Sequence, residues 1–316
     1  MDSLVGQARG RGVAMLRSLV SLPALLMVLV LTTSVPALAA GETPVLEPFS
    51  SARVGAWALP GIAFLSAEGI LHGVAKGRLG GTDFVTQEQA ITLIGRTLGW
   101  TPKWPQNPSP QVDGFAQAYV AMATTLGVTP TFPRAPTSRL QAVQWLVKLL
   151  GLPLATIPNP FTDVPDALAP AVLSAVQAGI VQGNSPNTFN PLGEVTRAEF
   201  VAMLFSAQIA QQSSGAVQVS GATYFNRSGL ALVRQDPNDW TLLSGSTGLR
   251  SVAGVLRPVT VQGQGASLLV TETLAGAQSE LTITKSGSTL TTPSGKSVTL
   301  PAGVPAAAGA FLLPLP

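Results

Sequence analysis

Two arginines in this chain stand where an anion could be held. Arg139 and Arg197 each follow directly on a hydroxyl residue, Ser138 or Thr196, which has a glutamine or glutamate three positions later. That spacing is a capping box and predicts that each arginine lies in the first turn of a helix, where backbone N–H groups and the helix dipole favour negative charge. A guanidinium adds a planar fork that pairs bidentately with a carboxylate at any relevant pH. The pattern therefore predicts an anion-binding position at each arginine.

The same pattern occurs once more, earlier in the chain, but without an arginine. Thr86 and Gln89 form the capping box, and Gln87 occupies the position of the arginines. An amide can hydrogen-bond to a sugar or a carboxylate but contributes no charge. We therefore expect the position of Gln87 to be weaker, specialised for a neutral group, or inactive.

The capping boxes belong to a unit that occurs three times, at a period of roughly 50 residues. The interval from Gly69 to Thr86 equals the interval from Gly179 to Thr196, and the middle copy has a shortened loop. Apolar residues at helical spacing follow each box. We predict three helix-loop-helix repeats. They span residues 45–101, 107–153 and 159–208.

The third copy has the most complete signature. It consists of Phe161-Thr162-Asp163-Val164, Gly179-Ile180-Val181-Gln182-Gly183, Phe189-Asn190-Pro191 and Thr196-Arg197-Ala198-Glu199. These residues closely resemble the surface-layer homology (SLH) repeat. The resemblance implies a mainly α pseudo-trimer with a central helix from each repeat and binding grooves between neighbouring lobes. It also implies noncovalent anchoring of an exported protein to a bacterial cell-wall polysaccharide, whose terminal sugar often carries a pyruvate ketal.

The same resemblance implies a set of carbohydrate-binding residues. They are Arg197, Arg139, Gln87, Trp57, Phe115, Gly73 and Gly183. The arginines would hold a carboxylate, the aromatic rings would face a sugar, and the glycines would permit a positive φ or close approach of a ligand. Each binding role has a structural alternative. The arginines could be solvated residues of the first helical turn, and Trp57 could be a core residue. The third copy lacks an aromatic residue at this position. If each groove combines residues of two neighbouring repeats, Trp57 or Phe115 would complement an arginine of another repeat.

The first 39 residues have the features of a secretory signal peptide. Arg9, Arg11 and Arg17 precede an apolar run from residue 19 to residue 31, and Ala37-Leu38-Ala39 follows as a small-residue cleavage signal. The run is short for a membrane span, and an uncleaved membrane anchor is the alternative. We expect a protein secreted to the cell wall or cell surface, with no integral membrane span after cleavage.

Composition excludes several kinds of partner and site. The chain has no cysteine, so it has neither disulfides nor a lipid-modified N-terminal cysteine. Charged residues make up only 10%, and removal of the signal leaves a nearly neutral chain, so nucleic acid is not an expected partner. The single histidine, His72, allows neither a Ser-His-Asp constellation nor a multi-histidine metal site. We expect no cofactor, no metal and no enzymatic activity.

The helical pattern ends at a polar linker over residues 209–215, and residues 216–316 are predicted to form a small all-β domain, either a sandwich or a barrel. No family is recognised for it. Candidate strands are Ala216–Ser220, Leu230–Arg234, Trp240–Leu243, Ser251–Leu256, Ser267–Thr271, Glu280–Thr284, Thr289–Thr291 and Ser297–Leu300. A hairpin turn is expected at Lys285-Ser286-Gly287-Ser288. The tail from Pro301 to Pro316 is expected to be an edge strand or disordered.

Three classes of function fit these features. The preferred one is a wall-binding module that displays the β domain. The second is a structural surface-layer or envelope protein that self-assembles through the β domain. The third is a wall hydrolase, for which the β region offers only Asp236, Asp239, Glu272 and Glu280 as acids. Because Asp236-Pro237-Asn238-Asp239 is typical of a turn, we do not favour the hydrolase.

Overall fold

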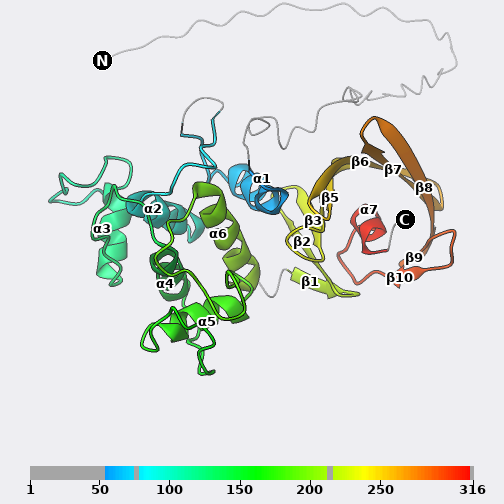
Figure 1. Cartoon of the computed structure of the whole chain (residues 1–316). Helices are drawn as coiled ribbons and strands as arrows, with labels where there is room; N and C mark the ends of the chain where they lie inside the picture. The colour runs from blue at the N-terminus through cyan, green and yellow to red at the C-terminus, as the bar shows by residue number, and fades with distance from the viewer. Residues whose placement is uncertain (1–53, 75–77, 212–215, 314–316) are drawn as a thin grey trace, which may run out of the picture. The chain divides into compact units, whose positions relative to one another are not determined.

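The computed structural model describes residues 54–74, 78–211 and 216–313. The expected signal peptide, residues 1–39, lies outside the described residues. A helical region is followed by a sheet of antiparallel strands, which confirms the predicted fold class (Figure 1). In the part of the chain that is described, no helix combines the length and apolar character needed to cross a membrane.

The helical region consists of three pairs of helices, as the repeats predict. The pairs are α1 (Leu59–Ala67) with α2 (Gln87–Thr97), α3 (Gln117–Thr125) with α4 (Arg139–Leu149), and α5 (Ala169–Gln177) with α6 (Arg197–Gln211). A short 3-10 turn, η2 (Ala56–Ala58), precedes α1. Helix α6 continues to Gln211 and thus into the segment expected to be linker.

All three second helices begin at the predicted capping boxes. The hydroxyls accept from the backbone N–H three residues later, at 3.3 Å for Thr86 and Gln89, 3.2 Å for Ser138 and Gln141, and 3.3 Å for Thr196 and Glu199. The longer side chains accept from the N–H of the cap residue at 3.4, 3.0 and 2.8 Å. The starting points of α2, α4 and α6 are therefore determined by local sequence.

A closed ring of backbone hydrogen bonds joins the three repeats. The N–H of Val85 donates to the carbonyl of Val195 at 3.0 Å, Val195 donates to Thr137 at 3.0 Å, and Thr137 donates to Val85 at 2.8 Å. Each of these residues is buried and directly precedes a cap residue. The ring relates the repeats by a pseudo-threefold axis.

The helices follow the same cyclic order. Helices α2, α4 and α6 contact one another, and each is covered by the first helix of another repeat: α3 packs on α2, α5 on α4 and α1 on α6 (Figure 1). Each repeat therefore needs its neighbours to bury its apolar surface, and the three should fold as one unit.

The C-terminal region is one antiparallel meander of ten strands in sequence order. The strands are β1 (Ala216–Val219), β2 (Ala222–Arg227), β3 (Leu230–Arg234), β4 (Trp240–Ser244), β5 (Thr247–Val252), β6 (Val255–Gln264), β7 (Ser267–Leu274), β8 (Ala277–Ser286), β9 (Thr289–Thr291) and β10 (Ser297–Thr299). The sheet curls around α7 (Ala306–Gly309) (Figure 1). It is a single curved sheet, so it resembles a barrel rather than a two-sheet sandwich, and no pairing between β1 and β10 closes it within the described strands.

Two local predictions in this region are wrong. The candidate strand Ser251–Leu256 contains a hairpin turn at Ala253 and Gly254, whose φ angles of 50° and 79° match the primed turns favoured between twisted strands. The tail after Pro301 forms α7 and the 3-10 turn η3 (Ala310–Leu312), not an edge strand. Phe311 is 2% exposed there, because the concave face of the sheet needs an apolar cover. The turn expected around Gly287 is confirmed.

The outer face of the first strands packs directly on the helical region. The ring of Phe225 on β2 lies 5.2 Å from that of Phe64 on α1 and 6.0 Å from that of Phe205 on α6. Glu68 and Arg227 form an ion pair beside them at 3.0 Å. Helices and sheet thus share one hydrophobic core.

Candidate functional site

The residue that follows each helix cap reaches into a loop of the next repeat. The Gln87 side chain accepts from the N–H of Phe132 at 3.2 Å, Arg139 donates to the carbonyl of Gln182 at 2.6 Å, and Arg197 donates to the carbonyl of His72 at 2.6 Å. Repeat 1 thus contacts repeat 2, repeat 2 contacts repeat 3, and repeat 3 contacts repeat 1. The structure therefore places each predicted polar residue at a boundary between two repeats.

The backbone at the start of these helices is not free to bind an anion. The N–H of Arg139 donates to Gly193 at 2.8 Å, and that of Arg197 donates to Asp83 at 2.8 Å. The next N–H group in each helix is also bound to a loop carbonyl, at 3.0 Å in both cases. The expectation that these groups would assist anion binding is wrong, because loops of other repeats already satisfy them. Any anion must be held by side chains.

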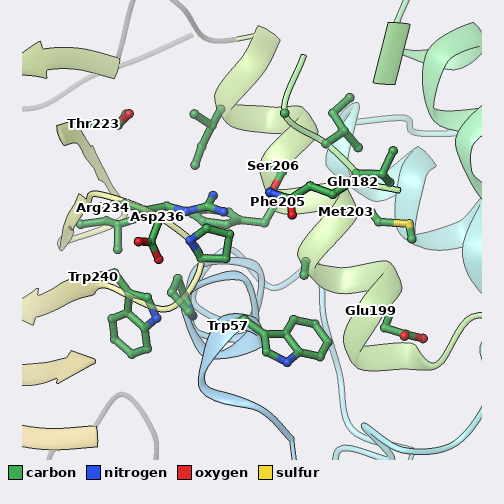
Figure 2. A pocket seen from close by; sticks show the side chains of 18 of the residues that line it. Trp57, Gln182, Glu199, Met203, Phe205, Ser206, Thr223, Arg234, Asp236 and Trp240 are labelled. Carbon is green, nitrogen blue, oxygen red and sulfur yellow. The ribbon is translucent and has the colours of Figure 1, made fainter. Parts of the chain in front are cut away.

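A cavity of about 560 Å³ lies beside Arg139. The helical region contributes Trp57, Arg139, Gln182, Glu199 and Met203, and the sheet region contributes Thr223, Arg234, Asp236 and Trp240 (Figure 2). Its volume falls within the roughly 300–1,000 Å³ that is usual for ligand pockets. Of the seven residues proposed from the sequence, only Arg139 and Trp57 line it.

Arg139 is held in position without a neutralising partner. Its guanidinium carbon lies 4.8 Å from the centroid of the Phe189 ring, and its Nε atom is buried with no hydrogen-bond partner. Burial lowers the pKa of Arg139 because it disfavours the charged form, while the negative charge of Glu199 acts in the opposite direction. Among the described residues, no carboxylate lies within ion-pair distance of Arg139. An anionic ligand would supply the missing charge.

The carboxylate of Glu199 is already engaged. Its Oε2 atom accepts from both the backbone N–H and the hydroxyl of Thr196, each at 2.8 Å. These bonds complete the capping box of α6. Glu199 therefore lines the cavity but is committed to the helix start.

Trp57 reaches the cavity from another repeat. It lies in the turn before α1 and is 37% exposed, which favours its interpretation as a ring that faces a sugar over its interpretation as a core residue. The neighbouring Pro60 at the start of α1 also lines the cavity. The aromatic residue of repeat 1 and the arginine of repeat 2 thus share one groove.

Arg197 occupies a more enclosed position. It is 7% exposed, and Arg96 lies next to it, donating to the Nδ1 atom of His72 at 2.9 Å and to the carbonyl of Ile70 at 3.2 Å. Burial lowers the pKa of Arg197, and the positive charge of Arg96 lowers it further, whereas Asp83 opposes both. This burial rules out the alternative that Arg197 is a solvated residue at the first turn of its helix.

The remaining predicted residues lie apart from the cavity. Gln87 is 4% exposed, and Phe115 is 48% exposed. Gly73 is exposed beside His72. Gly183 does not have the expected positive φ; a Cβ atom there would lie 2.5 Å from the carbonyl oxygen of Ser185, so the loop itself excludes a side chain. The positive φ occurs at Gly179, where α5 ends.

Sequence reasoning missed several residues of this site. Phe189 belongs to the Phe-Asn-Pro motif of repeat 3, which could have indicated its supporting role, but its contact with Arg139 crosses a repeat boundary. Arg234 and Trp240 carry no local signal, because an isolated arginine or tryptophan in a strand has many uses.

Comparison with known families agrees with this geometry. The S-layer homology domain model matches residues 52–91 and 160–201, the first and third repeats. The middle repeat lies outside the matched ranges but has the same capping box and the same place in the backbone ring. A search of curated proteins found no match. The chain therefore contains two regions that match the S-layer homology domain, and such domains support a general role in anchoring at the cell wall or cell surface.

Proposed function

We propose that the cavity beside Arg139 binds a carboxylated sugar of the cell-wall polysaccharide and so anchors the exported protein without a covalent bond. The observation that supports this most directly is the partly buried, unpaired guanidinium of Arg139 in a cavity that also contains the exposed ring of Trp57. The resemblance to SLH repeats makes a pyruvate ketal the first candidate for the carboxylate.

The two side chains supply complementary interactions. The guanidinium can form two parallel hydrogen bonds to a carboxylate, and one of its nitrogens is already fixed by the carbonyl of Gln182. The ring of Trp57 offers an apolar face to the C–H groups of a sugar. The contact with Phe189 restricts the guanidinium, so less conformational freedom is lost on binding.

We assign binding rather than hydrolysis to this cavity. Hydrolysis of a glycosidic bond requires two carboxyl groups that are available to act as acid and base or nucleophile. Glu199 is engaged with Thr196, and Asp236 accepts from the N–H groups of Asn238 and Asp239 at 2.7 and 2.9 Å. Both carboxylates therefore stabilise the fold.

The test is co-sedimentation of the mature protein with purified wall sacculi, before and after the secondary polysaccharide is removed. Arg139→Gln keeps most of the side-chain volume but removes the charge, and it should weaken binding about tenfold or more. Arg134→Ala is the matched control, because it removes an exposed arginine of the same repeat whose ion pair with Asp113 lies at the surface.

The possible outcomes separate clearly. Loss of binding by Arg139→Gln but not by Arg134→Ala, together with dependence on the polysaccharide, would support the proposal. Undiminished binding of Arg139→Gln would remove the site assignment. Failure of the parent protein to sediment would mean that the repeats serve only as a scaffold.

A further inference from the structure

We propose that the β region completes the binding site, with Arg234 and Trp240 forming a second subsite beside that of Arg139 and Trp57. The ligand would then be an anionic oligosaccharide segment with acidic groups on two of its sugar units. This inference rests on the proposed function, and it gives the β region a role in recognition rather than one of display alone.

The strand register places the relevant side chains on one face of the sheet. Arg234 on β3 lies directly opposite Thr223 on β2 and Trp240 on β4. Directly opposed residues of antiparallel strands project to the same side. All three line the cavity, whereas the adjacent Val233 belongs to the core on the other face, around α7. The sheet therefore presents Arg234 and Trp240 toward the helical region.

Arg234 resembles Arg139 in its lack of a neutralising partner. Within the described residues its guanidinium has neither an ion pair nor a hydrogen bond. Burial lowers the pKa of Arg234, and the nearby charge of Asp236 opposes this effect only in part. The side chains of Arg234 and Asp236 approach the cavity together from the sheet (Figure 2). Because Asp236 is engaged with backbone N–H groups, Arg234 retains capacity for an external anion.

Trp240 provides a second, independent indication of a ligand. It is 1% exposed, and its indole Nε1 atom is buried without a hydrogen-bond partner. Figure 2 shows this nitrogen on the side of the ring that is turned toward the cavity. An unsatisfied buried donor is costly, and a hydroxyl or carboxylate oxygen of a ligand would satisfy it.

The cavity thus contains two indole rings and two guanidinium groups that form no ion pair among the described residues, one of each from the helices and one of each from the sheet. Glu199 and Asp236 also line it, so the formal charges of these two carboxylates and the two arginines sum to zero. The carboxylates accept hydrogen bonds from other groups and do not pair directly with either guanidinium. A single carboxylated sugar could pair directly with only one arginine, whereas two acidic sugar units could pair with both.

The experiment is isothermal titration calorimetry on the full mature chain with two probes: polysaccharide fragments released from purified sacculi, and the same fragments after chemical reduction of their carboxyl groups. The variants are Arg234→Gln, Trp240→Phe and Arg139→Gln, with Lys285→Ala as a control that removes one exposed positive charge from β8. Thermal unfolding of each variant verifies folding. Arg234→Gln breaks no side-chain hydrogen bond or ion pair of the described residues, so it remains informative if Trp240→Phe destabilises the core.

We expect Arg234→Gln to weaken binding of the native fragments about tenfold to a hundredfold, and carboxyl reduction to remove the difference between this variant and the parent. Lys285→Ala should bind like the parent. Normal binding by Arg234→Gln with weakened binding by Arg139→Gln would overturn the second subsite and leave the proposed function intact. Normal binding by both arginine variants would overturn the second subsite and the proposed function alike. Equal binding of native and reduced fragments would exclude an acidic ligand.

Discussion

The guanidinium of Arg139, from repeat 2, lies 4.8 Å from the ring centroid of Phe189, from repeat 3. Phe189 is fully buried, and its ring centroid lies 5.6 Å from that of Phe161, near the start of the same repeat. The arginine is thus oriented by a fixed aromatic platform that its own repeat does not provide. The site depends on the assembly of all three repeats, since Trp57 comes from the first.

This relationship predicts that Phe189→Leu impairs binding as well as stability. The leucine fills much of the space but offers no ring face to the guanidinium, a contact worth about 0.5–2 kcal/mol. Affinity for wall polysaccharide should fall roughly twofold to thirtyfold, measured by calorimetry. Phe161→Leu is the control, because it removes a ring from the same cluster without removing the ring over Arg139. An equal loss of affinity in both variants would indicate a general disturbance of the loop.

A second prediction concerns acid sensitivity. The carboxylate of Asp163 accepts from the N–H of Phe189 at 2.9 Å and from that of Asn190 at 2.7 Å, and these bonds lower its pKa. A carboxyl whose pKa is lower in the folded state stabilises the protein above its unfolded pKa of about 3.9, and this contribution disappears as the pH falls through the folded pKa. Asp163→Asn should therefore lower the melting temperature at pH 7, and the difference from the parent should shrink as the pH falls below the unfolded pKa and through the lower folded pKa.

The measurement is thermal unfolding followed by circular dichroism at several pH values. Asp166→Asn is the matched control, because the carboxylate of Asp166 accepts from the side chain of Asn159 and from no backbone N–H of the described residues. A constant difference between Asp163→Asn and the parent at every pH would show that the bonds to Phe189 and Asn190 do not depend on the charge.

Arg197 should contribute more to stability than Arg139. It is 7% exposed and donates to the carbonyl of His72 at 2.6 Å, so its removal deletes a hydrogen bond made by a buried charged group. We expect Arg197→Gln to lower the free energy of unfolding by about 1–3 kcal/mol. Arg139→Gln should cost less, because that side chain faces a cavity. Urea unfolding of the two variants compares them directly, and the reverse order would contradict this assignment.

The sequence predicted what local patterns determine. A capping box needs only the residues between Thr86 and Gln89, or their counterparts, so all three helix starts could be located. The hairpin turn at Ala253 and Gly254 was missed because alanine at a positive φ is unfavourable and no Asn-Gly or Asp-Gly pair marked it. The shared groove could be anticipated only as a consequence of the SLH resemblance.

The sequence did not indicate that residues of the β region line the cavity. Arg234 and Trp240 are distant in sequence from Arg139, and their approach depends on how β2 to β4 pack on α1 and α6. Nothing in the residues near Arg234 indicates which face of the strand meets the helices. Contacts of this kind are fixed by burial across the whole unit.

The packing of Phe225 between Phe64 and Phe205 predicts that helices and sheet unfold together. Phe225 is 1% exposed, and its truncation to alanine should lower the free energy of unfolding by about 3–5 kcal/mol. Because this ring belongs to the core shared by both regions, two signals should lose their native values in one coincident transition: the helical signal at 222 nm, and the fluorescence of Trp240 in a background where the other four tryptophans are replaced by phenylalanine. Val298→Ala on β10 is the control, since it truncates the other core of the sheet, around α7. If Phe225→Ala separated the two signals into distinct transitions while Val298→Ala did not, the shared core would be a docking contact between regions that fold on their own, and the site at Arg139 would then assemble only when they meet.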